Sequence, residues 1–382
     1  MKSELCAPVI VRGLLSAGLA VAIFTAVLPT ATLRAQDSRQ LAQALAHDAK
    51  EEVDVDNRTR NFIVHLPQGY DPKQHYPVMI LLHGSNQSAE DMERLTHFNQ
   101  LADKNSIIAI YPNAVRGEWN IGVHPDQPAE MGQRRPYGRR GGWGGGYPGG
   151  GYPGGGGGYP GGQGGGQNGG QNRDENRTRP DPVDDVAFLN QMLDQLALKY
   201  SIDTRRIYAT GLGDGGFMAE RAGCSMADRI AAIAPVAADF PKAMICLPSR
   251  PVPAIFLEGT EDPIVPYNGG TYKPGRFHVL SAEDSAKTWA TYDRCAEKPK
   301  QDKIPASQKG AKETKTYTYN SCHDNALVSL YAIKDGGNTW PGGEQYMSEK
   351  EVGKVSNALN ANETIWSFLV TKKIAGESGV EK

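Results

Sequence analysis

The stretch Tyr208-Ala-Thr-Gly-Leu-Gly-Asp-Gly-Gly-Phe217 carries the strongest structural signal in this chain. Strand-like residues 206–210 run into a glycine-rich turn, and helical periodicity follows from Phe217. A strand-to-helix turn of the pattern Gly-x-Ser-x-Gly presents a nucleophilic serine at the top of a sheet. We call residues 211–216 the elbow. Its serine position is occupied by Gly213, which has no side chain, so the pattern predicts the turn without the nucleophile.

Apolar runs alternate with helical patterns on both sides of the elbow. Residues 76–82 form a continuous apolar run, which is typical of a strand buried on both faces. Residues 88–105 have one apolar helical face and begin with the capping sequence Ser88-Ala-Glu-Asp. The alternation predicts one α/β domain, with a mostly parallel sheet and helices on both faces. The predicted strands are 61–67, 76–82, 107–111, 206–210, 230–236, 253–258, 314–319 and 326–333, and the predicted helices are 88–105, 183–200, 217–229, 281–295 and 355–372.

The first 35 residues have the composition of an export signal. Lys2 and Arg12 supply positive charge, residues 13–28 form an apolar run, and small residues lead to a predicted cleavage site near Ala35. The apolar run is short for a membrane span, although an uncleaved anchor is the alternative. We expect the mature chain in the periplasm or outside the cell. Its predicted parts are an extension over 36–57, the domain over 58–372 and a tail over 373–382.

One segment inside the domain differs in composition from the rest. Residues 132–170 contain 22 of the chain's 45 glycines and repeat the sequence Gly-Gly-Tyr-Pro. Such a sequence buries too little apolar surface to offset its ordering entropy, so we predict a disordered insertion over 132–180. Residues 133–180 carry seven arginines against two acidic residues. This charge favours contact with an anionic surface, and the alternative is a low-complexity loop without a binding role.

The cysteines indicate disulfides. Cys6 lies in the predicted export signal, and Cys224, Cys246, Cys295 and Cys322 remain. Four cysteines in an exported chain predict two disulfides, for which three connectivities exist. We favour the sequential pairing of Cys224 with Cys246 and of Cys295 with Cys322. A metal site is the alternative, but no Cys-x-x-Cys sequence and no close pair of histidines accompanies these residues.

The composition of the chain bears on the size of its core and on its binding partners. The 382 residues are 39% hydrophobic and 22% charged, which is enough for a sizeable core. The formal net charge of −2 favours no particular partner, and we expect no nucleic-acid binding. We also predict that the protein binds no metal and no cofactor.

After the elbow, the chain carries candidate residues in the sequence order of a serine triad. Such a triad needs an acid and a histidine beside the nucleophile, and backbone donors for the oxyanion. Asp262 follows an apolar strand, where the acid is expected, and Asn338 lies in a glycine-rich loop where the histidine is expected. We expect a hydrogen bond between these two side chains. The predicted oxyanion donors are the backbone N–H groups of Gly84 or Ser85 and of Asp214.

Further motifs fall in the same order along the chain. They are Leu82-His-Gly, Tyr111-Pro-Asn, Trp119-Asn, Asp184-Asp-Val-Ala-Phe-Leu, Ile202-Asp-Thr-Arg-Arg-Ile-Tyr-Ala-Thr-Gly, Met218-Ala-Glu-Arg-Ala-Gly-Cys, Ala234-Pro-Val-Ala, Gly259-Thr-Glu-Asp-Pro-Ile-Val-Pro-Tyr and Thr339-Trp-Pro-Gly-Gly. Over residues 58–372, without the insertion, the chain resembles the polyhydroxybutyrate depolymerase/feruloyl esterase family of secreted α/β-hydrolases. The resemblance implies an α/β-hydrolase fold, and the family's cysteine placement is similar to the sequential pairing.

Two catalytic positions depart from that family's pattern. The family has serine where this chain has Gly213 and histidine where it has Asn338, whereas the acid Asp262 is retained. Loss of one triad member costs on the order of 10⁶ in kcat, and loss of the others costs little more. We therefore expect an exported pseudoenzyme that binds an ester, a polyester or a feruloylated carbohydrate. The residues predicted beside that ligand are His83, Tyr267 and Trp340.

Two alternatives to a binding protein remain open. In the first, the chain is an active carboxylic ester hydrolase with Asp214 as displaced nucleophile. Leu212 would then lie where the elbow needs a small residue, and Asn338 cannot act as the base. Without such a role, we expect the Asp214 side chain to point outward. In the second alternative, the fold is a scaffold and the basic insertion over 132–180 mediates surface attachment.

Overall fold

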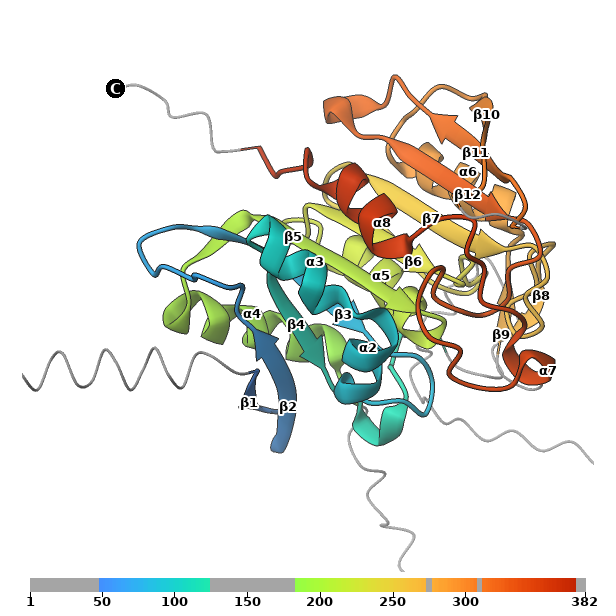
Figure 1. Cartoon of the computed structure of the whole chain (residues 1–382). Coiled ribbons are helices and arrows are strands. Elements are labelled where there is room, and N and C mark those ends of the chain that lie inside the picture. The colour runs from blue at the N-terminus through green and yellow to red at the C-terminus, as the bar shows by residue number, and fades with distance from the viewer. Residues whose placement is uncertain (1–47, 124–182, 273–276, 308–310, 376–382) are drawn as a thin grey trace, which may run out of the picture. The chain divides into compact units, whose positions relative to one another are not determined.

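The computed structural model describes residues 48–123, 183–272, 277–307 and 311–375 (Figure 1). The predicted export signal over 1–35 and the predicted insertion over 132–180 lie outside these residues. In the ranges that the structure describes, no helix is both long enough and apolar enough to cross a membrane.

One large sheet forms the centre of the described domain. Its strands are β1 (Ala49–Val55), β2 (Arg58–His65), β3 (Tyr76–Leu82), β4 (Ile108–Pro112), β5 (Ile202–Leu212), β6 (Ala232–Val236), β7 (Ala254–Gly259), β10 (Lys300–Ile304), β11 (Thr314–Tyr319) and β12 (Val328–Ile333). Their order across the sheet is β1-β2-β4-β3-β5-β6-β7-β12-β11-β10 (Figure 1). From β4 to β12 all neighbours are parallel, and both edges are antiparallel. The predicted, mostly parallel sheet is confirmed.

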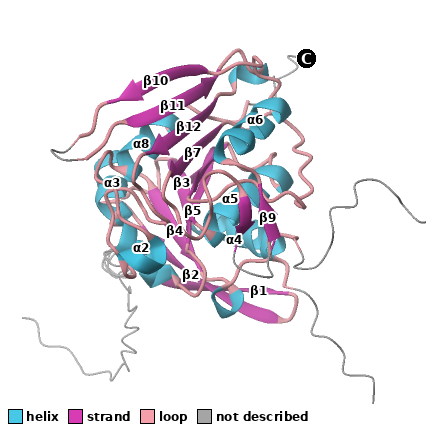
Figure 2. Cartoon of the chain, turned by 90° about the vertical axis from the view of Figure 1, so that its right-hand side faces the viewer, coloured by secondary structure: helices cyan, strands magenta, loops and turns pink. Residues whose placement is uncertain are grey.

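Helices cover both faces of this sheet, as predicted (Figure 2). One face carries α2 (Ala89–Thr96), α3 (Phe98–Asn105) and α8 (Ala361–Leu369), and the other carries α4 (Asp185–Lys199), α5 (Asp214–Ser225) and α6 (Ala282–Tyr292). The remaining described elements are the two-stranded sheet of β8 (Gly270–Tyr272) and β9 (Phe277–Val279), the short helix α7 (Glu349–Val352), and 3-10 turns at Val115–Gly117 and His323–Asn325.

Burial along the sheet follows the hydrophobic pattern. Every residue of β3, β4, β6 and β7 is buried, because helices pack on both faces of these central strands. The edge strand β10 was not predicted, and four of its five residues are exposed. It carries Lys300, Asp302 and Lys303, and charged side chains of this kind prevent an open edge from pairing with another chain.

The predicted helix over 88–105 is two helices. The capping box between Ser88 and Asp91 is confirmed. The helix ends at His97, whose left-handed backbone (φ 50°) caps α2 and precedes α3. The Thr96 hydroxyl donates to Met92 O at 2.7 Å. This break turns the chain so that Phe98 packs in the core, which an uninterrupted helical pattern does not reveal.

Two boundaries of the domain also differ from the prediction. The sheet begins at β1, inside the segment expected to be an extension over 36–57, because Ala49 to Val55 pair with β2 along their whole length. The closing helix begins at Ala361 and not at residue 355, because the Asn360 side chain accepts from Glu363 N and caps α8 there. At the other end, Ile374 N donates to Arg205 O at 2.9 Å, so the domain extends past residue 372.

The Asn120 side chain connects the two ends of the described chain on either side of the predicted insertion. Asn120 Nδ2 donates to Val183 O at 2.5 Å, and Asn120 Oδ1 accepts from Gly122 N at 3.0 Å. The Asn120 N–H donates to Asp185 Oδ2 at 2.6 Å, and Asp185 forms a buried ion pair with Arg60 at 2.7 Å. We call this arrangement the Asn120 clasp.

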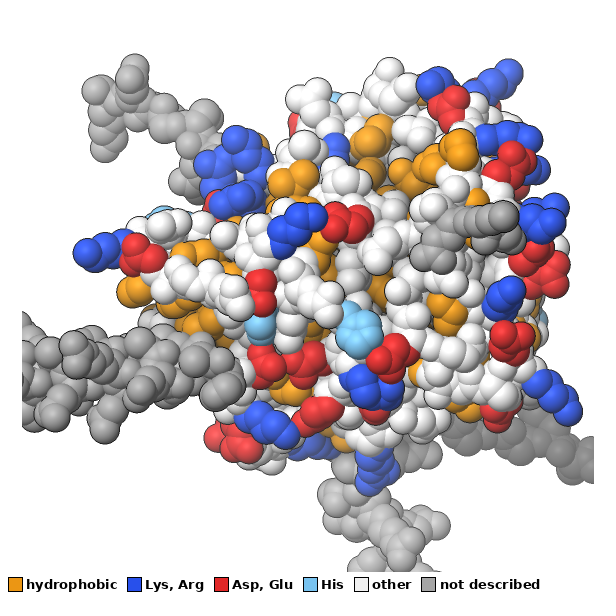
Figure 3. Space-filling view, viewed as in Figure 1, with side chains coloured by type: hydrophobic (Ala, Val, Ile, Leu, Met, Phe, Trp, Pro, Cys, Tyr) orange, Lys and Arg blue, Asp and Glu red, His pale blue; other side chains and the backbone are white. Residues whose placement is uncertain are grey.

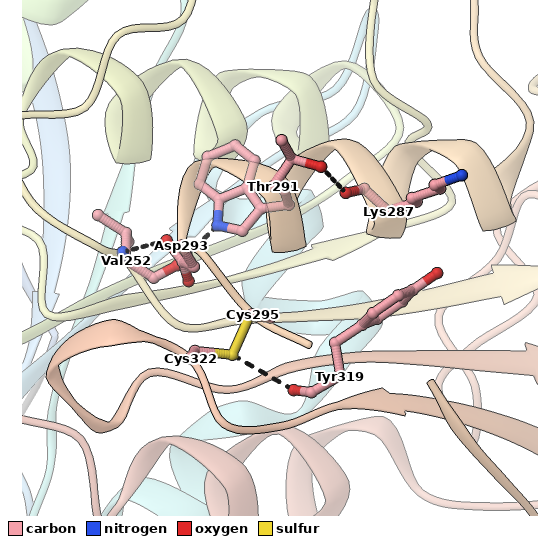
Figure 4. The surroundings of a disulfide bond; sticks show 8 residues. Val252, Lys287, Thr291, Asp293, Cys295, Tyr319 and Cys322 are labelled. Atoms are coloured by element: carbon pink, nitrogen blue, oxygen red, sulfur yellow. Dashed lines mark hydrogen bonds between the residues drawn. A yellow bond between two sulfur atoms is a disulfide. The ribbon is translucent and has the colours of Figure 1, made fainter. Parts of the chain in front are cut away.

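The sequential disulfide pairing is confirmed. Cys224 is bonded to Cys246, and Cys295 is bonded to Cys322. Figure 4 shows the second bridge beside Asp293, whose carboxylate accepts from Val252 N at 2.8 Å. The bridge therefore links the end of α6 to the segment before β12.

We predict that replacing both Cys295 and Cys322 by serine lowers the free energy of unfolding by about 3 to 4 kcal/mol. The expected loss is the loop entropy that the bridge removes from the unfolded chain, for cysteines 27 residues apart. Urea denaturation of the variant and of the oxidised protein measures the difference. An unchanged midpoint would show that the bridge contributes nothing to stability.

Candidate functional site

The elbow has the backbone of a nucleophile turn. β5 ends at Leu212, α5 begins at Asp214, and Gly213 between them has φ 54° and ψ −111°. The Gly213 N–H donates to Val236 O at 2.9 Å, which ties the turn to β6. A positive φ strains residues with a Cβ, whereas glycine adopts it readily. The predicted strand–turn–helix is confirmed, with the helix three residues earlier than expected.

The elbow glycines differ in the space around them. A Cβ on Gly211 would lie 2.6 Å from Leu82 O, and a Cβ on Gly215 would overlap the same carbonyl group. A Cβ on Gly213 would instead have Asn338 Oδ1 as its nearest neighbour, at 3.3 Å. The frame thus excludes side chains at Gly211 and Gly215, whereas position 213 has room for one directed at Asn338.

Asp262 and Asn338 meet as predicted. Asn338 Nδ2 donates to Asp262 Oδ2 at 2.8 Å. Asp262 Oδ1 accepts from the N–H groups of Ile264 at 2.7 Å and Val265 at 2.8 Å. Burial has the largest effect and raises the pKa of Asp262 to about 7, although these hydrogen bonds lower it. The position opposite the elbow therefore holds an amide that is fixed by a buried carboxyl group.

Tyr346 is a member of this cluster that the sequence did not suggest. Its hydroxyl lies 3.0 Å from Asn338 O and 3.2 Å from Asn338 Oδ1. The amide oxygen thus faces both the Tyr346 hydroxyl and the Cβ direction of Gly213, while the amide nitrogen faces Asp262. Tyr346 has no motif around it that would have identified it, because it reaches Asn338 from a loop eight residues further along the chain.

The predicted oxyanion loop is more fully hydrogen-bonded than expected. The Gly84 N–H donates to Gln87 Oε1 at 2.8 Å, so this donor is occupied in the structure. The Ser85 hydroxyl donates to Glu118 Oε1 at 2.6 Å. His83 is fully buried, with Nδ1 2.8 Å from Gly84 O and Nε2 accepting from Ala114 N at 3.0 Å. Main-chain groups occupy both ring nitrogens, which is typical of a structural role beside this loop, and its place beside a ligand stays a prediction.

Two further predictions are corrected by burial. Asp214 does not point outward, because its carboxylate is 3% exposed and accepts from Trp119 N at 2.9 Å. Trp340 does not border a ligand site, because it is 1% exposed, packs in the core and donates to Asn362 Oδ1 at 2.8 Å. Tyr267 remains partly exposed, with its hydroxyl 3.5 Å from Glu283 Oε1.

Comparison with known proteins finds esterases among the proteins similar to this chain. The family model described as "Putative esterase" matches residues 55–135. The protein described as "Putative esterase NocK" of Nocardia uniformis subsp. tsuyamanensis is 25% identical over 336 residues, which cover 84% of this chain and 81% of that protein. The chain is thus similar in sequence to an esterase over most of its length, and its sheet and helices have the arrangement of an α/β-hydrolase.

Other matches cover less of the relatives. Feruloyl esterase B of Piromyces equi is 36% identical over 163 residues, which are 40% of this chain and 28% of that protein. The bifunctional acetylxylan esterase/xylanase XynS20E of Neocallimastix patriciarum is 24% identical over 59% of this chain and 25% of that protein. The solved acetyl xylan esterase from Aspergillus awamori aligns with a TM-score of 0.47 at 10% identity, over 76% of this chain and 94% of that one. The chain is thus similar in sequence to parts of a feruloyl esterase and of an acetylxylan esterase/xylanase, and it spans about a quarter of the length of each.

Behind the elbow, this α/β-hydrolase buries three more carboxyl groups. Glu220 on α5, Asp239 after β6 and Glu258 on β7 are at most 1% exposed. The carboxyl oxygens of Glu220 and Asp239 have no hydrogen-bond partner within the described ranges, and Ala238 N donates to Glu258 Oε1 at 3.1 Å. Burial raises the pKa values of all three groups well above their ordinary range, and repulsion from neighbouring carboxyl groups, including Asp262, raises them further. The sequence did not indicate these acids, because no motif around them marks them as buried.

The raised pKa values predict that stability falls as pH rises. The unfolded carboxyl groups release their protons near pH 4, whereas the folded groups retain theirs, so the unfolding free energy declines above pH 4. We expect Asp239→Asn to lessen the decline between pH 5 and pH 8 by about 1 to 3 kcal/mol. Denaturant titrations at both pH values measure it. The exposed Glu297→Gln is the control, and an equal effect of both substitutions would contradict the prediction.

The elbow glycines provide a second test. Gly213→Ala should cost about 1 to 2 kcal/mol, because the left-handed backbone opposes a Cβ there and the Asn338 side chain, 3.3 Å away, has to shift slightly. Gly215→Ala should cost about 3 kcal/mol or more, because its Cβ meets main-chain atoms of Leu82 that cannot rotate away. Thermal and chemical denaturation compare the two variants. Equal losses would show that α5 can move away from β3 at little cost.

Proposed function

We propose that this esterase-like α/β-hydrolase is an exported, non-catalytic protein that binds an ester ligand at the elbow. The observation that carries the proposal is the direction of the missing Cβ of Gly213 toward Asn338, 3.3 Å away. Asn338 is in turn bonded to Asp262 at 2.8 Å. The positions of nucleophile, base and acid are therefore aligned, but only the acid position holds a residue suited to a triad.

The residues at the other two positions cannot perform the chemistry. Gly213 has no atom that could form an acyl-enzyme. Asn338 turns its Nδ2 donor toward Asp262, and an amide cannot take a proton from a nucleophile at neutral pH. Removal of a triad member costs on the order of 10⁶ in kcat. Binding and any remaining oxyanion donors would leave a rate on the order of 10³ above water.

The neighbouring carboxylate also favours a binding role. Asp214 is the residue closest in sequence to the missing nucleophile, but its carboxylate is buried and accepts from the main chain of Trp119. An ester carbonyl would have to displace this hydrogen bond to reach it. The interpretation of Asp214 as a displaced nucleophile is therefore disfavoured by its contacts.

For the ligand, we propose the ester of an acetylated or feruloylated carbohydrate. The names of the relatives in Piromyces equi and Neocallimastix patriciarum point to such esters. Export is proposed from the two disulfides, which form and persist in oxidising compartments, and from the predicted signal over 1–35.

An activity-restoration experiment tests the loss of catalysis. We expect no release of nitrophenol from a short-chain nitrophenyl ester by the natural protein above the residual level. Gly213→Ser with Asn338→His should raise the rate by at least about 10²-fold, because a nucleophile and a base are restored on an existing frame. Gly213→Ser with Asn338→Gln is the matched control and should stay inactive. Turnover by the natural protein that disappears in Asp262→Ala would overturn the proposal.

Binding is measured separately from turnover. Calorimetric titration with an acetylated and with a feruloylated xylo-oligosaccharide should give heats of binding that the deacylated oligosaccharides do not give. Gly213→Leu should abolish these heats, because the new side chain would fill the space in front of Asn338. Equal heats with acylated and deacylated sugars would overturn the assignment of an ester ligand while leaving the loss of catalysis standing.

A further inference from the structure

A cavity of about 520 Å³ lies at the edge of the sheet opposite the elbow. It is lined by residues that precede β6 and β7, by the turn at Asp324, and by the segment after α8. The strands β5, β6 and β7 are parallel, so their amino ends lie at one edge and Gly213 follows β5 at the other. This cavity is therefore independent of the site proposed above.

Arg250 contributes a rigid positive charge to the cavity. Its Nη1 donates to Pro251 O and its Nη2 to Ile230 O, both at 2.5 Å. Its Nε is buried and has no hydrogen-bond partner in the part of the chain that the structure describes. Main-chain carbonyls thus hold the guanidinium in place, and no carboxylate in that part forms an ion pair with it.

Lys372 and Lys373 bring two more cations to the same cavity. The Lys372 ammonium lies over the Phe368 ring, 5.3 Å from its centre, and burial lowers its pKa. The segment is anchored because Tyr208 donates to Lys372 O at 2.7 Å and Ile374 N donates to Arg205 O at 2.9 Å. Figure 3 shows Lys and Arg side chains gathered at the upper left, where the chain leaves α8 in Figure 1.

Among the described residues, the lining of the cavity carries fewer acidic groups than cations. Asp324 is the acidic residue among those lining it, and its carboxylate lies 3.1 Å from His323 Nδ1. Asp293 and Asp228 also attract the Arg250 guanidinium, and Asp293 accepts from Val252 N (Figure 4). Among the described residues that line the cavity there are three cations and one carboxylate, and burial has removed part of the hydration of Arg250 and Lys372.

We propose that this cavity binds a small doubly charged oxyanion, a phosphate or sulfate group, either free or as a monoester. Taking cations out of water costs free energy that a few neighbouring carboxylates offset only in part. A bound oxyanion offsets this cost and accepts hydrogen bonds from the lysine ammonium groups. The group enters from solvent on the side of Lys373, which is exposed.

Inorganic phosphate tests the proposal with the full mature chain. Thermal unfolding in sodium phosphate is compared with sodium chloride at equal ionic strength and pH. We expect phosphate near ten times its dissociation constant to raise Tm by on the order of 2 to 5 °C. Lys372→Gln with Lys373→Gln should weaken phosphate binding at least tenfold in calorimetric titrations.

The matched control is Lys300→Gln with Lys303→Gln. It removes the same charge from the exposed edge strand β10 and should bind phosphate like the natural protein. A control variant that loses as much affinity as the Lys372/Lys373 variant would reduce the effect to net charge and overturn the site. Absence of any phosphate shift over chloride would also overturn it. Titration with glycerol phosphate then distinguishes the sources, since tighter binding than inorganic phosphate assigns a monoester and weaker binding assigns the free ion.

Discussion

The packing of α5 against the end of β3 is the constraint on which the rest of the site depends. Gly211 and Gly215 allow their backbones to approach the Leu82 carbonyl so closely that neither position admits a Cβ. This approach fixes the direction of α5 and forces the chain through the left-handed turn at Gly213. It also places Glu220, one and a half turns into α5, in the interior with Asp239 and Glu258. Sheet–helix packing therefore maintains the elbow with glycine at its centre.

The Asn338 amide shows which part of a triad survives such a loss. A buried carboxyl group that lacks a donor is costly, and Asp262 would lack its side-chain donor if position 338 were apolar. The amide satisfies Asp262 on one side and meets the Tyr346 hydroxyl on the other. An imidazole would satisfy the same acid and would also move protons. On the proposed function, position 338 keeps one role of a triad histidine, holding the acid, and lacks the other, transferring a proton.

The sequence predicted what depends on local pattern. The bounds of β3 and β11, the capping box at Ser88, the sequential disulfides and the Asp262–Asn338 hydrogen bond were all expected. The predictions are wrong or incomplete where contacts between segments far apart in the sequence determine the environment of a residue. Trp340 resembled a binding-site aromatic until core packing was known, Gly84 N–H is taken by the Gln87 side chain, and no pattern marks Tyr346 or the buried carboxyl groups of Glu220 and Asp239. Burial of a polar group is a property of the assembled layers, so a linear pattern cannot show it.

The Asn120 clasp affects which insertions this domain can accept during evolution. Since one amide side chain holds both Gly122 and Val183, the distance between these two points is independent of how many residues separate them along the chain. The clasp in turn rests on the buried Arg60–Asp185 pair. Segments of very different length and composition can therefore be accepted at this position without altering the sheet. The fold thus provides a position at which insertions have little effect on the stability of the domain.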